Sequence, residues 1–272
     1  MKKLLIITFI SSTMALFGAE FAPSRPNPSM VRIIPVRPTP EPDNVDLTIT
    51  FPKRGQAVYR VPELQLQLEG FPIGAMSNFD RAKEIYNDSE GQSIRVIIDN
   101  LDPIEIYTSF VDGLDQNNQF FNQTLNKQIP YSLSDGEHAI RAFPVRSFGE
   151  SLKRPGCFAA RIFYMGSDNG ELDGDLGGPY LTYNEPLESI TYDQGSPILL
   201  DFYLTNAQLS RDGYKVRITI DDSIQRILTM WVPYYIQGLD SGSHKIHLEL
   251  LDEKNQVEAG TFNDVTKTIQ IR

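Results

Sequence analysis

The sequence predicts an all-β protein that contains two tandem β-sandwich domains. The first observation is an internal repeat, in which four blocks of sequence return in the same order. The second is an alternation of apolar and polar residues with a period of two. Repeated blocks indicate two copies of one structural unit, and alternation indicates strands that bury one face. The matched blocks are 47–52 with 181–186, 95–100 with 217–222, 130–140 with 233–246, and 156–158 with 260–262.

Residues 1–19 have the features of a secretory signal peptide. Two lysines precede an apolar run from Leu4 to Phe17, and small residues end it at Ala19. The run has about 14 residues, whereas a helix needs about 20 to cross a bilayer. We therefore expect cleavage and export, with no integral membrane segment afterwards. Cleavage removes two lysines and no acid, so the formal net charge of −10 becomes −12.

Residues 20–44 are rich in proline and predict an extended stalk. Proline at this density disfavours helix and sheet and favours the polyproline conformation. The simplest interpretation is a spacer between the cleavage site and the first domain. The alternative is a docking segment that acts through the apolar stretch 31–36.

The two domains are expected at 45–166 and 179–272. In the first, leucines at 64, 66 and 68 and the apolar residues at 94, 96 and 98 alternate with other residues. The second repeats this pattern at 216, 218 and 220. Each sheet should therefore bury one face and leave the other in water.

Between the domains, residues 167–178 form an acidic, glycine-rich linker. Its simplest role is a solvated hinge around which the domains move. Closely spaced oxygen ligands also suit Ca²⁺, although the spacing differs from the EF-hand pattern. The residues that would bind calcium are Asp168, Glu171, Asp173 and Asp175.

One short motif occurs in both domains and carries a resemblance. It reads Leu133-x-x-Gly136-x-His138-x-Ile140, and its twin runs from Leu239 to Ile246 through Gly242 and His244. The motif resembles the turn that enters a late strand of bacterial immunoglobulin-like and fibronectin type III-like domains. The resemblance implies seven-stranded antiparallel sandwiches joined end to end. It transfers no functional residue, and we expect both histidines to be structural residues at the rim of a core.

Three aromatic residues of the second domain are the candidates for a ligand-binding site. They are Trp231, Tyr234 and Tyr235. Exposed flat rings can stack on sugars or anchor a partner protein. In a sandwich the simpler use of such rings is to fill the core.

The single cysteine, Cys157, rules out a disulfide within the chain. Both domains must then rely on apolar cores, for which they are long enough. We expect Cys157 to be buried and inert; the alternative is a tether that forms a covalent dimer.

Composition and motifs narrow the class of function. The acidic charge and the absence of a basic stripe argue against nucleic-acid binding. The chain contains no recognisable catalytic or phosphate-binding motif, which predicts a protein that is not an enzyme and needs no cofactor. The sequence thus favours an exported binding or spacer protein of a bacterial envelope, in contact with another envelope protein. It would be periplasmic or secreted, with attachment to the cell surface left open.

Two alternatives come from other classes of protein. A carbohydrate-binding module would use the Trp231, Tyr234 and Tyr235 cluster and would need it exposed to solvent. A periplasmic assembly chaperone, also built from two immunoglobulin-like domains, would offer an unpaired strand edge and a cationic anchor between the domains.

Overall fold

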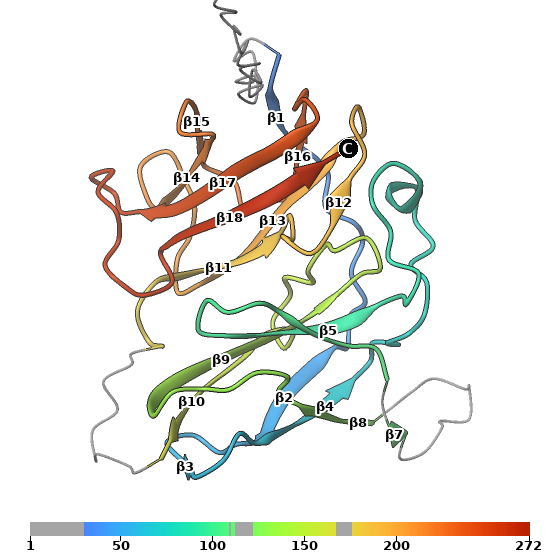
Figure 1. Ribbon diagram of the computed structural model, residues 1–272, viewed down its shortest axis with the longest axis vertical. Coiled ribbons are helices and arrows are strands. Elements are labelled where there is room, and N and C mark those ends of the chain that lie inside the picture. The colour runs from blue at the N-terminus through green and yellow to red at the C-terminus, as the bar shows by residue number, and fades with distance from the viewer. Residues whose placement is uncertain (1–29, 109, 112–121, 167–175) are drawn as a thin grey trace, which may run out of the picture.

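The computed structural model describes residues 30–108, 110–111, 122–166 and 176–272. The predicted signal peptide and the four proposed calcium ligands lie outside these residues. The all-β fold class is confirmed: four sheets pack in layers, and one 3₁₀ turn, η1 (Asp80–Lys83), is the only helical element described (Figure 1). In the described part of the chain, no helix is long and apolar enough to span a membrane.

The first sandwich encloses the core built around the predicted leucine and isoleucine positions. Leu66, Val96 and Ile98 are almost fully buried there because alternate side chains of facing strands point inward. One sheet contains β2 (Asp46–Phe51), β4 (Glu63–Glu69), β8 (Gln123–Gln128) and β7 (Phe110–Val111). The other contains β3 (Ala57–Val58), β10 (Ala159–Met165), β9 (Gly136–Val145), β5 (Ser93–Ile98) and β6 (Ile104–Ile106).

The second sandwich encloses a separate core with the same strand order. One sheet contains β1 (Arg32–Pro35), β16 (Tyr234–Gln237), β13 (Ile198–Thr205) and β11 (Tyr180–Glu185). The other contains β12 (Thr191–Tyr192), β18 (Asp264–Ile271), β17 (Gly242–Leu251), β14 (Lys215–Ile220) and β15 (Ile224–Leu228). Thus β2-β4-β8 corresponds to β11-β13-β16, and β3-β10-β9-β5-β6 corresponds to β12-β18-β17-β14-β15.

Two details of the predicted sandwiches need correcting. The sheets are not wholly antiparallel, because β3 pairs in parallel with β10 and β12 pairs in parallel with β18. In the third sequence block, Pro130-Tyr131 follows β8, whereas Pro233-Tyr234 leads into β16. The two Pro-Tyr pairs are therefore not structurally equivalent. Gly136 and Gly242 are equivalent, since each begins the corresponding long strand.

The two matched histidines form the same corner in both sandwiches. His138 Nε2 lies 2.8 Å from the Ser134 carbonyl, and its Nδ1 lies 2.7 Å from Asp99 Oδ2. His244 makes the equivalent contacts with the Asp240 carbonyl and the carboxylate of Asp221, both at 2.8 Å. Both rings are buried, as expected of structural residues. Their aspartate partners were not predicted from the sequence.

The proline-rich segment is not a free stalk over its described part. Its residues 32–35 form β1, which pairs antiparallel with β16 at the edge of the second sandwich. Val31 is buried in the core of that sandwich and Ile33 packs against it. Beyond β1, Thr39 donates to the carboxylate of Glu150 through its amide at 2.9 Å and its hydroxyl at 2.6 Å. The stretch 31–36 therefore docks, as the alternative predicted, but onto the second sandwich of the same chain.

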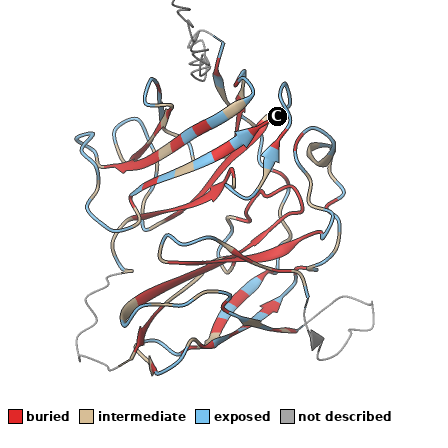
Figure 2. Cartoon of the chain, in the orientation of Figure 1, coloured by how far each residue is buried: buried red, intermediate tan, exposed pale blue. Residues whose placement is uncertain are grey.

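The two sandwiches pack face to face and not end to end. The sheet that holds β5 and β9 lies against the sheet that holds β11 and β13, and Figure 2 shows these strands coloured as buried. Consequently the second face of β5, which carries Arg95 and Ile97, is buried and not wet. A packed interface of this kind disfavours the expected hinge motion, which is the default only for small contacts between domains.

Candidate functional site

The junction between the sandwiches contains a buried ionic network centred on Arg95. Its Nε donates to Glu105 Oε1 at 2.5 Å, and its Nη1 donates across the junction to Asn184 Oδ1 at 2.5 Å and Glu185 Oε1 at 2.9 Å. The guanidinium thus joins β5 and β6 of one sandwich to β11 of the other. A fork of fixed donors suits this task, because it satisfies several oxygens in a defined geometry.

Glu185 is the titratable group most affected by this environment. Burial raises the pKa of its carboxyl to about 7, and the positive charge of Arg95 only partly offsets this effect. Arg95 is shared with Glu105, and the hydroxyl of Tyr192 donates to Glu185 Oε2 at 3.2 Å. The carboxyl therefore changes protonation near neutral pH while it is part of the contact between domains.

A second buried acid, Asp201 on β13, ties the same faces together. Its carboxylate accepts hydrogen bonds from Ser151 Oγ at 2.6 Å, Asn184 Nδ2 at 2.6 Å and Lys153 Nζ at 2.5 Å. The side chain of Asp201 is fully buried, and a buried charge is tolerated only when it is paired and hydrogen-bonded in this way. These bonds stabilise the junction and occupy both oxygens of the Asp201 carboxylate.

An apolar cluster forms the other part of the junction. Ile97, Phe143 and Val145 of the first sandwich pack on Tyr203 of the second, and the ring of Phe158 stacks on Tyr203 with centroids 4.5 Å apart. Aromatic pairs at this separation add to the free energy gained by burial.

Two of the three aromatic candidates are buried, and the third, Trp231, is half-buried. Trp231 is half-buried against Tyr203 and donates from Nε1 to the Phe202 carbonyl at 3.0 Å. Tyr234 is 3% exposed in the second core, and Tyr235 is 8% exposed and bonds Glu84 across the junction at 2.9 Å. The exposure required by the carbohydrate-binding alternative is therefore absent at Tyr234 and Tyr235.

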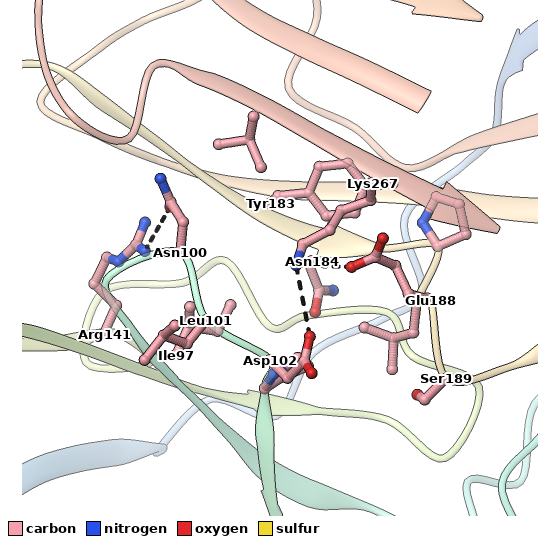
Figure 3. A pocket seen from close by; sticks show the side chains of 14 residues that line it. Ile97, Asn100, Leu101, Asp102, Arg141, Tyr183, Asn184, Glu188, Ser189 and Lys267 are labelled. Atoms are coloured by element: carbon pink, nitrogen blue, oxygen red, sulfur yellow. Dashed lines mark hydrogen bonds and ion pairs between the residues drawn. The ribbon is translucent and has the colours of Figure 1, made fainter. Parts of the chain in front are cut away.

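A cavity of about 320 Å³ opens beside this junction (Figure 3). Its walls come from both sandwiches: the loop after β5 on one side, and the loop after β11 with β18 on the other. Lys267 lies between two acids, 3.1 Å from Glu188 and 3.8 Å from Asp102, and the second of these pairs links the two sandwiches. The apolar lining residues are Ile97, Leu101, Pro103, Tyr183, Pro186, Leu187 and Val265, and the remaining ones include Asn100, Arg141, Asn184 and Ser189.

A second, more polar cavity of about 180 Å³ lies on the other side of the loop at 187–190. It shares Leu187 and Ser189 with the first cavity and is lined by the Arg95 network. Here Tyr107 donates to Asp88 Oδ2 at 2.7 Å, and burial is the main cause that raises the pKa of this tyrosine. Asp88 and the charged groups of the Arg95 network already have partners here, so the first cavity is the better candidate for a ligand.

Cys157 is fully buried in the first core, just before β10. Burial raises the pKa of the thiol to about 12, so it is neither accessible nor ionised at neutral pH. The covalent-dimer alternative for Cys157 is therefore contradicted by the folded structure.

One potential metal cluster was not anticipated from the sequence. His247, Glu249 and Asp264 place ligand atoms within 4.8 Å of one another on the outer sheet of the second sandwich. Glu249, however, accepts two hydrogen bonds of 2.5 Å from Arg217, which occupies its carboxylate and adds a positive charge. This arrangement explains the cluster as an ion-pair network.

The junction residues were missed because they sit at positions where a sandwich strand usually faces water. One signal was present: residues 198–204, Ile-Leu-Leu-Asp-Phe-Tyr-Leu, lack alternation. A nearly continuous apolar run indicates a strand buried on both faces. It marks β13 as a contact strand, although it does not name the partner surface.

Comparisons with known proteins give a likeness of fold. No protein-family model matches the chain, and the search of curated proteins finds no match. Among solved structures, the fibronectin(III)-like modules of Clostridium thermocellum CbhA match with a TM-score of 0.28 and 10% identity, over 83% of this chain and 94% of that one. The D00-D0 domain of Intimin matches with a TM-score of 0.24 and 9% identity, over 83% and 99%.

A third neighbour is a Bacteroides ovatus protein of a mixed-linkage glucan utilization locus, solved with a heptasaccharide. It has a TM-score of 0.20 and 15% identity, and the match covers 84% of this chain but 48% of that protein. The sandwich fold of this chain rests on its own strand order and cores.

Proposed function

We propose that this chain is an exported, non-enzymatic binding or spacer protein of a bacterial envelope that acts through protein–protein contacts. The observation that carries the proposal is the packed junction, in which two sandwiches share a buried ionic network and an apolar cluster. A pair of modules fixed in this way presents its outer surfaces at a constant distance and orientation. That property suits a spacer or an adaptor better than a catalyst.

The ionisable groups of the junction support the same proposal. Arg95, Glu185 and Asp201 are held in hydrogen bonds that connect the sandwiches. Catalytic acids and bases need to reach a substrate, whereas these groups are buried and saturated with protein partners. We therefore assign them to architecture, and we place the protein in the periplasm or outside the cell, in contact with another envelope protein.

Cross-linking in envelope fractions, followed by capture of the purified full chain, tests the proposal. A reproducible partner protein, recovered from the envelope and absent from a cytoplasmic extract, is the expected result. Hydrolysis of an envelope polymer by the purified protein, lost in Glu185→Gln, together with failure to recover a partner, would overturn it.

A further inference from the structure

A third cavity, of about 350 Å³, has cations as the only charged residues among the described residues that line it. These cations are Arg54, in the loop after β2, and Arg161 on β10 of the first sandwich. The opposite wall comes from β11 and the end of β13 in the second sandwich. Since the chain has a formal net charge of −10, a lining with two cations and no acid is a local exception that attracts anions.

Neither arginine has an acidic partner among the residues that the structure describes. Arg161 donates from Nη2 to the carbonyl oxygen of Ile49 at 2.7 Å, and its Nε is buried. Arg54 is exposed to solvent and forms no ion pair within the described part of the chain. The groups left for a ligand are therefore Nη1 of Arg161 and the whole guanidinium of Arg54.

The same two positions form an ion pair in the second sandwich. Arg54 corresponds to Glu188, since each lies two residues after the proline that ends the first matched block and three residues before β3 or β12. Arg161 corresponds to Lys267, since each faces the equivalent isoleucine of β9 or β17. Lys267 Nζ lies 3.1 Å from Glu188 Oε2. The first sandwich thus has two cations where its twin has a cation and an acid.

This comparison identifies the missing group as a carboxylate. Besides Lys267, the carboxylate of Glu188 accepts a hydrogen bond from the amide of Thr268 at 2.8 Å. The equivalent amide belongs to Ile162, which also lines the cavity. A carboxylate from outside the chain would therefore lie where the twin holds its own glutamate. Guanidinium groups suit this task, because they bind carboxylates through paired, charge-assisted hydrogen bonds.

The remaining walls favour an organic acid over a phosphate. Phe158, Ile162, Leu176 and Tyr180 supply aromatic and aliphatic surface. Such walls match the carbon skeleton of an organic acid, as in most pockets for small molecules. A phosphate group has no apolar part to bury. Its charge of about −1.5 to −2 is also repelled more strongly by an acidic protein than the single charge of a carboxylate.

We propose that this cavity binds the carboxylate of an organic acid through Arg54 and Arg161, with the carbon skeleton of the acid packed on Phe158 and Tyr180. The inference does not depend on the proposed function and adds a ligand site to it. A free small acid and an acidic side chain of a peptide present the same group to the cavity, so the experiment separates these two sources.

An NMR titration of the isotope-labelled full chain tests the inference. The probes are benzoate, as a free acid, and N-acetyl-glutamate methylamide, as a peptide side chain; benzamide is the neutral control. Benzoate is expected to shift the amide resonances of Ile162 and Gly177 with a dissociation constant on the order of 1 mM. Benzamide should bind at least about tenfold more weakly, because it lacks the charge. Tighter binding of the glutamate derivative than of benzoate would assign the site to a peptide, and the reverse order to a free acid.

Variants identify the site. Arg54→Glu copies Glu188 of the twin and supplies the carboxylate from within the chain, so it should abolish the benzoate shifts without lowering the melting temperature. Arg54→Gln should weaken binding about threefold to tenfold. Arg60→Glu makes the same charge change at an exposed arginine outside the cavity, and should alter the dissociation constant by less than about twofold.

Three results would overturn the inference. The first is equal binding of benzoate and benzamide, and the second is tighter binding of inorganic phosphate than of benzoate. The third concerns the acids at 168, 171, 173 and 175, which precede Leu176 in the chain. Their joint replacement by asparagine and glutamine should strengthen binding by less than about threefold. A gain of about tenfold or more would mean that acids of the chain itself compete for the cavity.

Discussion

The five-stranded sheets of the two sandwiches have equivalent strands but opposite surroundings. Arg95 on β5 corresponds to Arg217 on β14, since each pairs with the equivalent position of the neighbouring long strand. Arg95 is buried and reaches across to the other sandwich, whereas Arg217 bonds to Glu249 of its own sheet. The position of Glu249 is occupied by Phe143 in the first sandwich, and Arg95 bonds instead to Glu105 on β6 and to acceptors on β11.

The opposing sheets differ in the same manner. Tyr203 and Asp201 on β13 correspond to Gln67 and Gln65 on β4, judged by their pairing with β11 and β2. The first pair is buried at the junction, and the second is exposed. One face of each sandwich thus carries contact residues, while the other is polar.

The largest expected difference in stability between equivalent positions of the two sandwiches is at Arg95. We expect Arg95→Ala to lower the free energy of unfolding by about 3–5 kcal/mol, because Glu105 and Glu185 would be left buried without their partner. Arg217→Ala, at the equivalent position, should cost only about 0–1 kcal/mol, since that pair is partly exposed. Urea denaturation of both variants measures the difference. Equal losses would show that the junction does not depend on the ion network.

The next test exchanges equivalent residues of the opposing sheets. Tyr203→Gln, which copies the first sandwich, should lower the free energy of unfolding by about 2–4 kcal/mol through loss of the aromatic cluster. Gln67→Tyr, the reverse change on an exposed face, should change it by about 0.5 kcal/mol or less. A large effect of Gln67→Tyr would mean that the polar face of β4 is itself part of a contact.

A pH dependence should distinguish the junction from the exposed faces. The ordinary pKa of a glutamate is 4.5, and in the folded protein that of Glu185 is raised to about 7. Between these values the folded state keeps the proton and the unfolded state has lost it. The free energy of unfolding therefore decreases as pH rises through this window, by about 2–3 kcal/mol in total. The decrease should be present in the wild type and missing in Glu185→Gln, measured by urea denaturation at both ends of the window.

The smallest expected difference lies at the two histidine corners. His138→Ala and His244→Ala should each cost about 1–3 kcal/mol, because each removes a buried ring together with its contacts to an aspartate and a carbonyl. Since the corners have the same geometry, the two losses should agree within about 0.5 kcal/mol. A larger disagreement would show that the sandwiches are coupled through these corners as well as through the junction.

Local pattern was enough to predict the fold class, because alternation at positions such as Leu64 to Leu68 reports on one strand and its core. The junction was not predictable in the same way. Arg95 and Arg217 look alike in sequence, and each bonds an acid of its own sheet, Glu105 or Glu249. Which of them also crosses to another domain depends on the surface packed against its sheet. The prediction of a stalk for the proline-rich segment was wrong for a related reason. Strand β1 forms by pairing with a strand some 200 positions later in the chain.

The placement of β1 has a consequence for how the protein is made. The strand is among the first described residues to be synthesised, yet its partner β16 is among the last. Until β16 is synthesised, Val31 and Ile33 have no core to pack against and stay exposed to solvent. An unpaired apolar strand is a risk for aggregation during that interval. The pairing of β1 with β16 therefore closes a loop around the entire first sandwich, and a chain truncated before β16 could not complete it.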